Sequence, residues 1–140
     1  MPVIDVYAPE DLVPAARERE LAVELMDAAL KADGFPPPVP DAIRDVVGVF
    51  FHRLPPSAVD TGNTERARVV RLQVTAAEGG FDRAGAEAFI AEATAAVASA
   101  TGDPSQAERT RIYVTQAMKG GLGLNGVVRG LGTRESGGRR

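Results

Sequence analysis

The spacing of hydrophobic and polar positions in the first half of the chain predicts a strand, a helix and a second strand. The β-branched run at residues 3–7 predicts the first strand. From Pro14 to about Lys31, polar residues recur at helical spacing beside an apolar stripe, which predicts an amphipathic helix that Gly34 ends. Residues 45–52 are almost continuously apolar, and they predict a second strand that is largely buried.

The second half of the chain repeats this plan. Residues 67–76 predict a third strand, Asp82 is placed to cap a helix that runs to about Ala100, and residues 110–117 predict a fourth strand. The order β-α-β, β-α-β belongs to the α/β (α+β) class. Because each unit crosses over with a right hand, its two strands are parallel, and both helices cover one face of a four-stranded sheet.

The two halves also match residue by residue, which indicates an internal repeat at about residues 2–53 and 66–117. The matching apolar positions are Ile4 with Leu72, Val6 with Val74, Leu21 with Phe89, and Leu25 with Ala93. Pro2 has no counterpart in the second half, because Val70 stands where it would recur.

One face of the predicted sheet carries no helix. The predicted second strand nevertheless places apolar side chains on both of its faces, at Val46, Val47, Val49, Phe50 and Phe51. A bare apolar sheet face is unstable in water, so we expect other copies of the chain to cover it.

The length of the chain limits the number of domains, and its charge limits the kinds of partner that we expect. With 140 residues, 44% of them hydrophobic, the chain is long enough for one core and too short for two ordinary domains. We expect one domain over residues 1–126 and a flexible, glycine-rich tail over residues 127–140. A net charge of -3 offers no positive field, so neither nucleic acid nor a membrane is an expected partner.

The residue types argue against several kinds of site. The sequence has no cysteine and a single histidine, which excludes disulfides, thiolate metal sites and a multi-histidine centre within one chain, so no metal is expected. No cofactor is expected either, because the proton transfer proposed below for Pro2 needs none. The start of the chain lacks the features of a signal peptide, and no apolar stretch reaches membrane-spanning length. These features predict a soluble, cytoplasmic protein.

Pro2 is the residue to which the sequence assigns chemistry, because removal of Met1 would leave a secondary amine at the end of the chain. An α-amino group has a pKa of about 7.7 to 8.0, and burial among apolar groups or cations lowers that pKa. Such an amine suits general base catalysis at neutral pH. It would also be held rigidly, since a strand follows it directly. The alternative is a processed terminus with no role in chemistry.

Several segments follow a pattern that one superfamily shares. They are residues 2–7, 46–53, 60–62, 101–104 and 112–114, with the glycine-rich segment 120–126 where relatives carry a closing turn. Together with the double β-α-β plan, they resemble the tautomerase superfamily from Pro2 to about Gly126. This superfamily includes 4-oxalocrotonate tautomerase, macrophage migration inhibitory factor, cis-3-chloroacrylic acid dehalogenase and malonate semialdehyde decarboxylase. The resemblance implies a homotrimer with the terminal proline in a pocket at each subunit interface.

The residues that would assist Pro2 are less well marked. Relatives bind a substrate carboxylate with arginines just after the third strand, where this chain has Ala-Ala-Glu-Gly-Gly at residues 76–80. The absence of those arginines weakens the dehalogenase and decarboxylase hypotheses, because a guanidinium fork suits a carboxylate. Arg44 and Asp45, just before the second predicted strand, are candidate substrate-binding residues. Their alternative role is that of solvated charges at a strand end.

Three further residues are candidates for substrate binding. Tyr113 and Gln116 on the last strand could donate hydrogen bonds to a developing enolate oxygen, although burial of Tyr113 in the core is an alternative. Arg71 would reach an interface pocket or make an ion pair between subunits. For His52, the single histidine, a local hydrogen bond is the favoured role.

The leading functional hypothesis is a tautomerase. Neutral Pro2 removes a proton from a carbon beside a carbonyl, and the protonated proline returns it at another position of a small 2-oxo or unsaturated acid. A hydratase, dehalogenase or decarboxylase of the same superfamily is an alternative, and so is a non-catalytic oligomeric binding module. The missing arginines suggest a substrate that is not a dicarboxylate, or one held by Arg44 or a neighbouring subunit.

Overall fold

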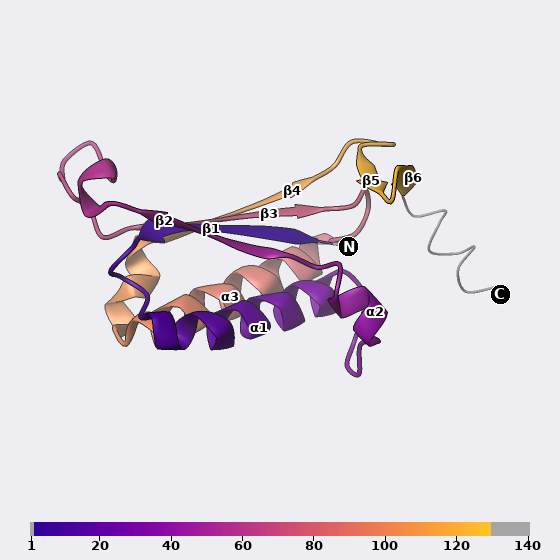
Figure 1. The fold of residues 1–140 in the computed structure, drawn as a ribbon, viewed down its shortest axis with the longest axis horizontal. Helices are drawn as coiled ribbons and strands as arrows, with labels where there is room; N and C mark the ends of the chain where they lie inside the picture. Colours follow the sequence, from indigo (N-terminus) through magenta and orange to yellow (C-terminus); the bar gives the residue numbers. More distant parts are fainter. Residues whose placement is uncertain (1, 130–140) are drawn as a thin grey trace.

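The computed structural model describes residues 2–129 and has a four-stranded sheet with two long helices on one face (Figure 1). The first half contains β1 (Val3–Pro9), α1 (Ala15–Ala32), α2 (Asp41–Arg44) and β2 (Val49–Leu54). The second half contains β3 (Val70–Ala76), α3 (Arg83–Thr101) and β4 (Thr110–Gln116). A small separate sheet follows, made of β5 (Leu122–Leu124) and β6 (Val127–Arg129). Two 3₁₀ turns lie at Pro56–Ala58 and Pro104–Arg109.

The sheet has the order β2-β1-β3-β4 and the predicted internal repeat. The two strands of each half are parallel, whereas β1 and β3 run antiparallel at the centre. There Ile4 lies opposite Val74, and Val6 lies opposite Leu72, so an approximate two-fold axis between β1 and β3 exchanges the matched residues. The predicted double β-α-β architecture is therefore confirmed.

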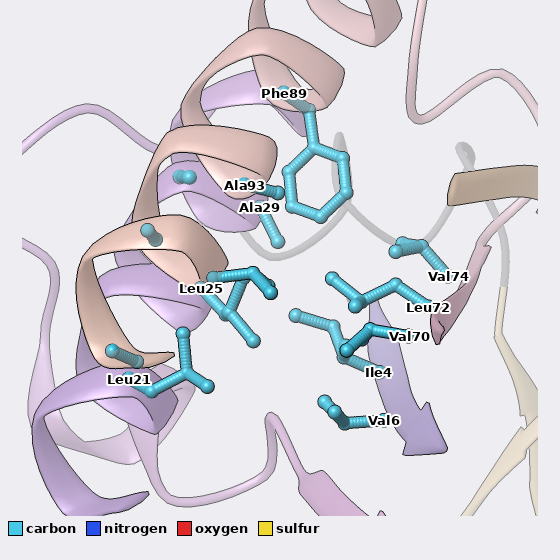
Figure 2. Close-up of a cluster of buried hydrophobic side chains, with 14 of the residues drawn as sticks. Ile4, Val6, Leu21, Leu25, Ala29, Val70, Leu72, Val74, Phe89 and Ala93 are labelled. Carbon is cyan, nitrogen blue, oxygen red and sulfur yellow. The ribbon is translucent and has the colours of Figure 1, made fainter. Parts of the chain in front are cut away.

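The core lies between the sheet and the two helices, which lie side by side (Figure 1). Alternate residues of β1 and β3 point to the helices, where Leu25 of α1 and Phe89 of α3 meet them (Figure 2). Each of these large apolar side chains is at most 1% exposed, and such burial stabilises the fold by about 1.5 to 3 kcal/mol per side chain. The Asp82 carboxylate caps α3 by accepting a 2.7 Å hydrogen bond from the backbone N–H of Gly85.

The second strand differs from its prediction in position and in burial. β2 begins at Val49 rather than at residue 45, because the chain first makes a helical turn in α2, where the Asp45 N–H donates to the Asp41 carbonyl at 2.8 Å. Proline at position 40 favours that turn, since its φ of -57° suits the residue before a helix. Within one chain β2 is not largely buried, and Phe50 is 55% exposed.

Other boundaries shift by a few residues. The third strand begins at Val70 rather than at residue 67. The hairpin of β5 and β6 continues to Arg129, past the predicted domain end at residue 126, and the rest of the predicted tail, residues 130–140, lies outside the described residues. Among the described residues, no helix is long and apolar enough to cross a membrane.

Candidate active site

Pro2 lies at one end of the sheet and is buried. Val3 pairs with Thr75, so the next step of the antiparallel register sets Pro2 level with Ala76. On the other side, the Ile4 N–H donates to the Gly48 carbonyl at 2.9 Å, which sets Pro2 close to the buried Val47. An amine at Pro2 would therefore have apolar neighbours from both halves of the chain.

The loop that follows β3 closes this end of the sheet. Gln116, the last residue of β4, holds the loop with both ends of its side chain: Nε2 donates to the Phe81 carbonyl at 2.8 Å, and Oε1 accepts from the Gly79 N–H at 3.0 Å. The Ala117 N–H also donates to the Ala76 carbonyl at 2.8 Å. The structure thus places Gln116 at the same end of the sheet as Pro2, where its amide positions the loop.

Arg44 and Asp45 lie at the end of α2 rather than at a strand end. The Arg44 Nη1 donates to the Asp27 Oδ1 of α1 at 2.6 Å, so this guanidinium already has a carboxylate partner. Asp45 is exposed and is separated from β2 by residues 46–48. The ion pair of Arg44 fastens α2 to α1, which is a structural role.

Arg71 and Tyr113 lie on the face of the sheet that has no helix. The Arg71 Cζ is 5.3 Å from the ring centroid of Tyr7 and 5.5 Å from that of Tyr113, at cation–π distances. Tyr113 is 51% exposed, so it is not part of the core. From Arg71 to Ala76, the residue level with Pro2, β3 rises by about 16 Å. Within one chain, these two side chains do not share a site with Pro2.

His52 makes the local hydrogen bond that the sequence favours. Its Nε2 lies 2.7 Å from the Asp5 Oδ1, and its ring stacks on Tyr7 with centroids 4.2 Å apart. The cluster of Asp5, His52, Tyr7, Arg71 and Tyr113 thus makes the bare face polar and aromatic at its centre. Sequence patterns placed these residues on strands, but only the register of the strands brings them together.

Asp33 is a residue at this end of the molecule that the sequence analysis missed. It follows α1 directly, its side chain is 0% exposed, and it lies against the loop after β3. A Cβ atom added to Gly80 would lie 2.1 Å from the Asp33 Oδ1. The carboxylate therefore occupies the space that a side chain at position 80 would need. One signal was present in the sequence: an acid at a helix C-terminus opposes the helix dipole.

Solved structures of other proteins have a similar arrangement of strands and helices. No protein-family model matches the sequence, and no curated protein matches it either. A fused 4-OT solved as a symmetric trimer matches with a TM-score of 0.75 and 17% identity, over 94% of this chain and 98% of that chain. A member of the cis-3-chloroacrylic acid dehalogenase family matches with a TM-score of 0.74 and 18% identity, over 96% and 88% of the two chains.

Macrophage migration inhibitory factor of Toxoplasma gondii has the same arrangement, with a TM-score of 0.70 and 16% identity over 91% of this chain and 99% of that chain. The matches span nearly the whole length of each chain, including both β-α-β units. At these identities they establish the fold, and they confirm at that level the resemblance drawn from the sequence.

Proposed function

We propose that this chain, which has the fold of the tautomerase superfamily, is a cofactor-independent tautomerase whose base is the amine of Pro2. The proposal requires removal of Met1. The observation that carries it is the position of Pro2, which is buried directly before β1 with Ala76 and Val47 as neighbours. A base on a rigid strand keeps its geometry during reaction, which a base on a fraying terminus cannot do.

The reaction needs only proton transfer. The neutral amine takes a proton from a carbon beside a carbonyl, so the C–H bond breaks, an N–H bond forms and the substrate becomes an enolate. The resulting prolinium then returns a proton at another position, and the net change is isomerisation. Positioned proton transfer contributes about 10² to 10⁴ in rate, and hydrogen bonds to the enolate oxygen supply further acceleration.

The substrate is proposed to be a small 2-oxo or unsaturated acid, held in part by a neighbouring subunit of a homotrimer. Arg44 is the weaker partner for its carboxylate, because Asp27 already holds that guanidinium. Arg71 and Tyr113 lie on the bare face that other copies are expected to cover, about 16 Å along the sheet from Pro2 of the same chain. We therefore assign them to the Pro2 site of another subunit.

There are two alternatives to the tautomerase function. A hydratase, dehalogenase or decarboxylase would use the same amine on an unsaturated acid or a semialdehyde, but the space beside Gly80 holds the Asp33 carboxylate instead of an arginine. A binding module would use the bare face without chemistry. The binding module predicts no Pro2-dependent isomerisation, whereas a hydratase, dehalogenase or decarboxylase predicts turnover of an unsaturated acid or a semialdehyde.

The test starts with the intact mass of the purified protein, which reports whether Met1 is removed. Ketonisation of phenylenolpyruvate is then measured for the wild type, for Pro2→Ala and for Pro14→Ala, a matched change at an exposed proline. Loss of Met1 with activity that Pro2→Ala removes and Pro14→Ala retains is the expected result. Retention of Met1, or activity indifferent to Pro2, would favour the binding module.

A further inference from the structure

A cavity opens on the bare face of the sheet, at the end opposite to Pro2. It lies between the sheet and the loop that joins β2 to β3, which Figure 1 shows at the end away from the N-terminus. Its volume is about 250 Å³. Such a space holds about eight groups of the size of a water molecule, since each takes about 30 Å³ in the liquid. Its lining comes from both halves of the chain and includes Tyr7, Leu54, Val59, Asp60, Val69 and Arg71.

The loop that forms the outer wall of the cavity is held in place by hydrogen bonds. The N–H of the buried Ala67 donates to the Val59 carbonyl at 2.7 Å. The Asp60 Oδ1 accepts a 3.0 Å hydrogen bond from the Arg66 N–H, which supports the left-handed φ of 52° at Arg66. The loop therefore forms this wall before any ligand binds, and a preformed cavity lowers the entropic cost of binding.

Arg71 is the cation of the cavity, whose other walls are largely apolar. Its Cζ lies 5.3 Å from the Tyr7 ring centroid, and its Nη2 donates to the neutral amide Oε1 of Gln73 at 3.3 Å. Among residues 2–129, no carboxylate forms an ion pair with this exposed guanidinium. A guanidinium whose face lies over a ring keeps N–H groups at its edge for a carboxylate. The complementary ligand has one carboxylate and an apolar body.

Asp60 gives the loop side of the cavity a negative charge. Its carboxylate lines the same space of about 250 Å³ as the Arg71 guanidinium. A ligand that places one carboxylate on Arg71 and carries a second one at its other end would bring two negative charges together in this space. Like charges at close range disfavour binding, so the cavity discriminates against dicarboxylates.

We propose that this cavity binds the substrate as a monocarboxylic acid with an apolar body of about six carbons, which with the two carboxylate oxygens fills the available space. Arg71 binds the carboxylate, Tyr7, Val59 and Val69 contact the apolar body, and Asp60 excludes a second carboxylate. This inference rests on the proposed function for one point, that the ligand is the substrate of a neighbouring subunit's Pro2 site.

The experiment measures binding without turnover. Hexanoate is added to ¹⁵N-labelled Pro2→Ala protein, and amide chemical shifts are followed by NMR. Adipate is the comparison ligand, because it has the same six-carbon chain with a second carboxylate. Arg71→Gln and Asp60→Asn are made in the same background, and Asp60→Asn keeps the oxygen that accepts from the Arg66 N–H. Arg111→Gln is the matched control, since Arg111 is an exposed arginine of β4 that donates to the Glu108 carbonyl at 3.1 Å.

The expected result is saturable binding of hexanoate, with the largest amide shifts at Tyr7, Val59 and Val69. Arg71→Gln should weaken it at least about tenfold, because a charge-assisted pair is lost, and Arg111→Gln should leave it unchanged. Adipate should bind about tenfold more weakly than hexanoate, and Asp60→Asn should narrow that difference severalfold. Equal affinities for the two acids, or shifts that map to other residues, would overturn the inference even if a variant fails to fold.

The two proposals fail separately. If hexanoate occupies the cavity but the wild type does not ketonise phenylenolpyruvate, the binding site stands and the tautomerase proposal is wrong. If turnover depends on Pro2, hexanoate should inhibit it by raising KM, and Arg71→Gln should raise KM more than it lowers kcat. Turnover that neither hexanoate nor Arg71→Gln affects would refute the cavity as the substrate site and leave the Pro2 activity in place.

Discussion

Gly80 is predicted to be irreplaceable only as long as Asp33 carries its carboxylate. A Cβ at position 80 would lie 2.1 Å from the Asp33 Oδ1 and 3.0 Å from the Ala77 carbonyl oxygen, whereas ordinary contact begins at 3.4 Å. The carboxylate must therefore retreat into a packed interior, and overpacking of this kind destabilises a fold by about 1 to 3 kcal/mol. Gly80→Ala should lower the free energy of unfolding by that amount.

The origin of the cost is tested with a double-mutant cycle in urea, at one fixed protein concentration because the proposed assembly would contribute to stability. In the Asp33→Ala background, the closest clash is absent, so Gly80→Ala should cost about 1 kcal/mol less than in the wild type. Gly62→Ala is the control, since a Cβ there meets nothing within 4 Å. Equal costs of Gly80→Ala in both backgrounds would refute the placement of Asp33 against Gly80.

Three further predictions concern the core, the acid range and the bare face. Phe89→Ala should lower the free energy of unfolding by about 3 to 5 kcal/mol in the same urea assay, because the ring is 1% exposed; a loss below about 1 kcal/mol would contradict its place in the core. The hydrogen bond from Arg53 holds the pKa of Glu18 below its usual value in the folded protein. The stability that this ion pair adds is therefore present above the pKa that Glu18 has in the unfolded chain, and it is lost as the pH falls through the pKa that Glu18 has in the folded protein. The midpoint temperature of thermal unfolding should therefore fall less between pH 6 and pH 3 in Glu18→Gln than in the wild type, and parallel falls would count against this ion pair. Phe50→Glu should dissociate the assembly in sedimentation velocity, while Ile90→Glu, a similar change at a 40% exposed residue of α3, should not; dissociation by both or by neither would contradict assembly through the bare face.

The sequence predicted those parts of the fold that follow from short-range periodicity. Both long helices and the central strands have apolar spacing that only one local structure satisfies, and Asp82 has the side chain that an N-cap requires. The predicted start of the second strand was wrong. Val46 and Val47 have strand-forming side chains, yet they follow the helical turn that Asp41 begins. At these residues the packing of α2 on α1 overrides the local preference for a strand.

The candidate site also has features that the sequence predicted and features that it did not. The position of Pro2 before a strand could be read from neighbouring residues. The burial of Asp33 could not, because it depends on Gly80, a residue far along the chain whose missing side chain makes room for the carboxylate. The contact of Arg71 with Tyr7 and Tyr113 likewise depends on strand register, which single-sequence patterns do not fix.

The approximate two-fold axis between β1 and β3 has a consequence for the number of bases per subunit. The two ends of the sheet are near copies in backbone, with Val70 where Pro2 would recur. A free proline amine, however, exists only at the start of a chain, and no substitution can create one in the middle. Joining two β-α-β units in a single polypeptide therefore leaves one end of the sheet without this chemistry, and frees its residues from the constraints that a base imposes.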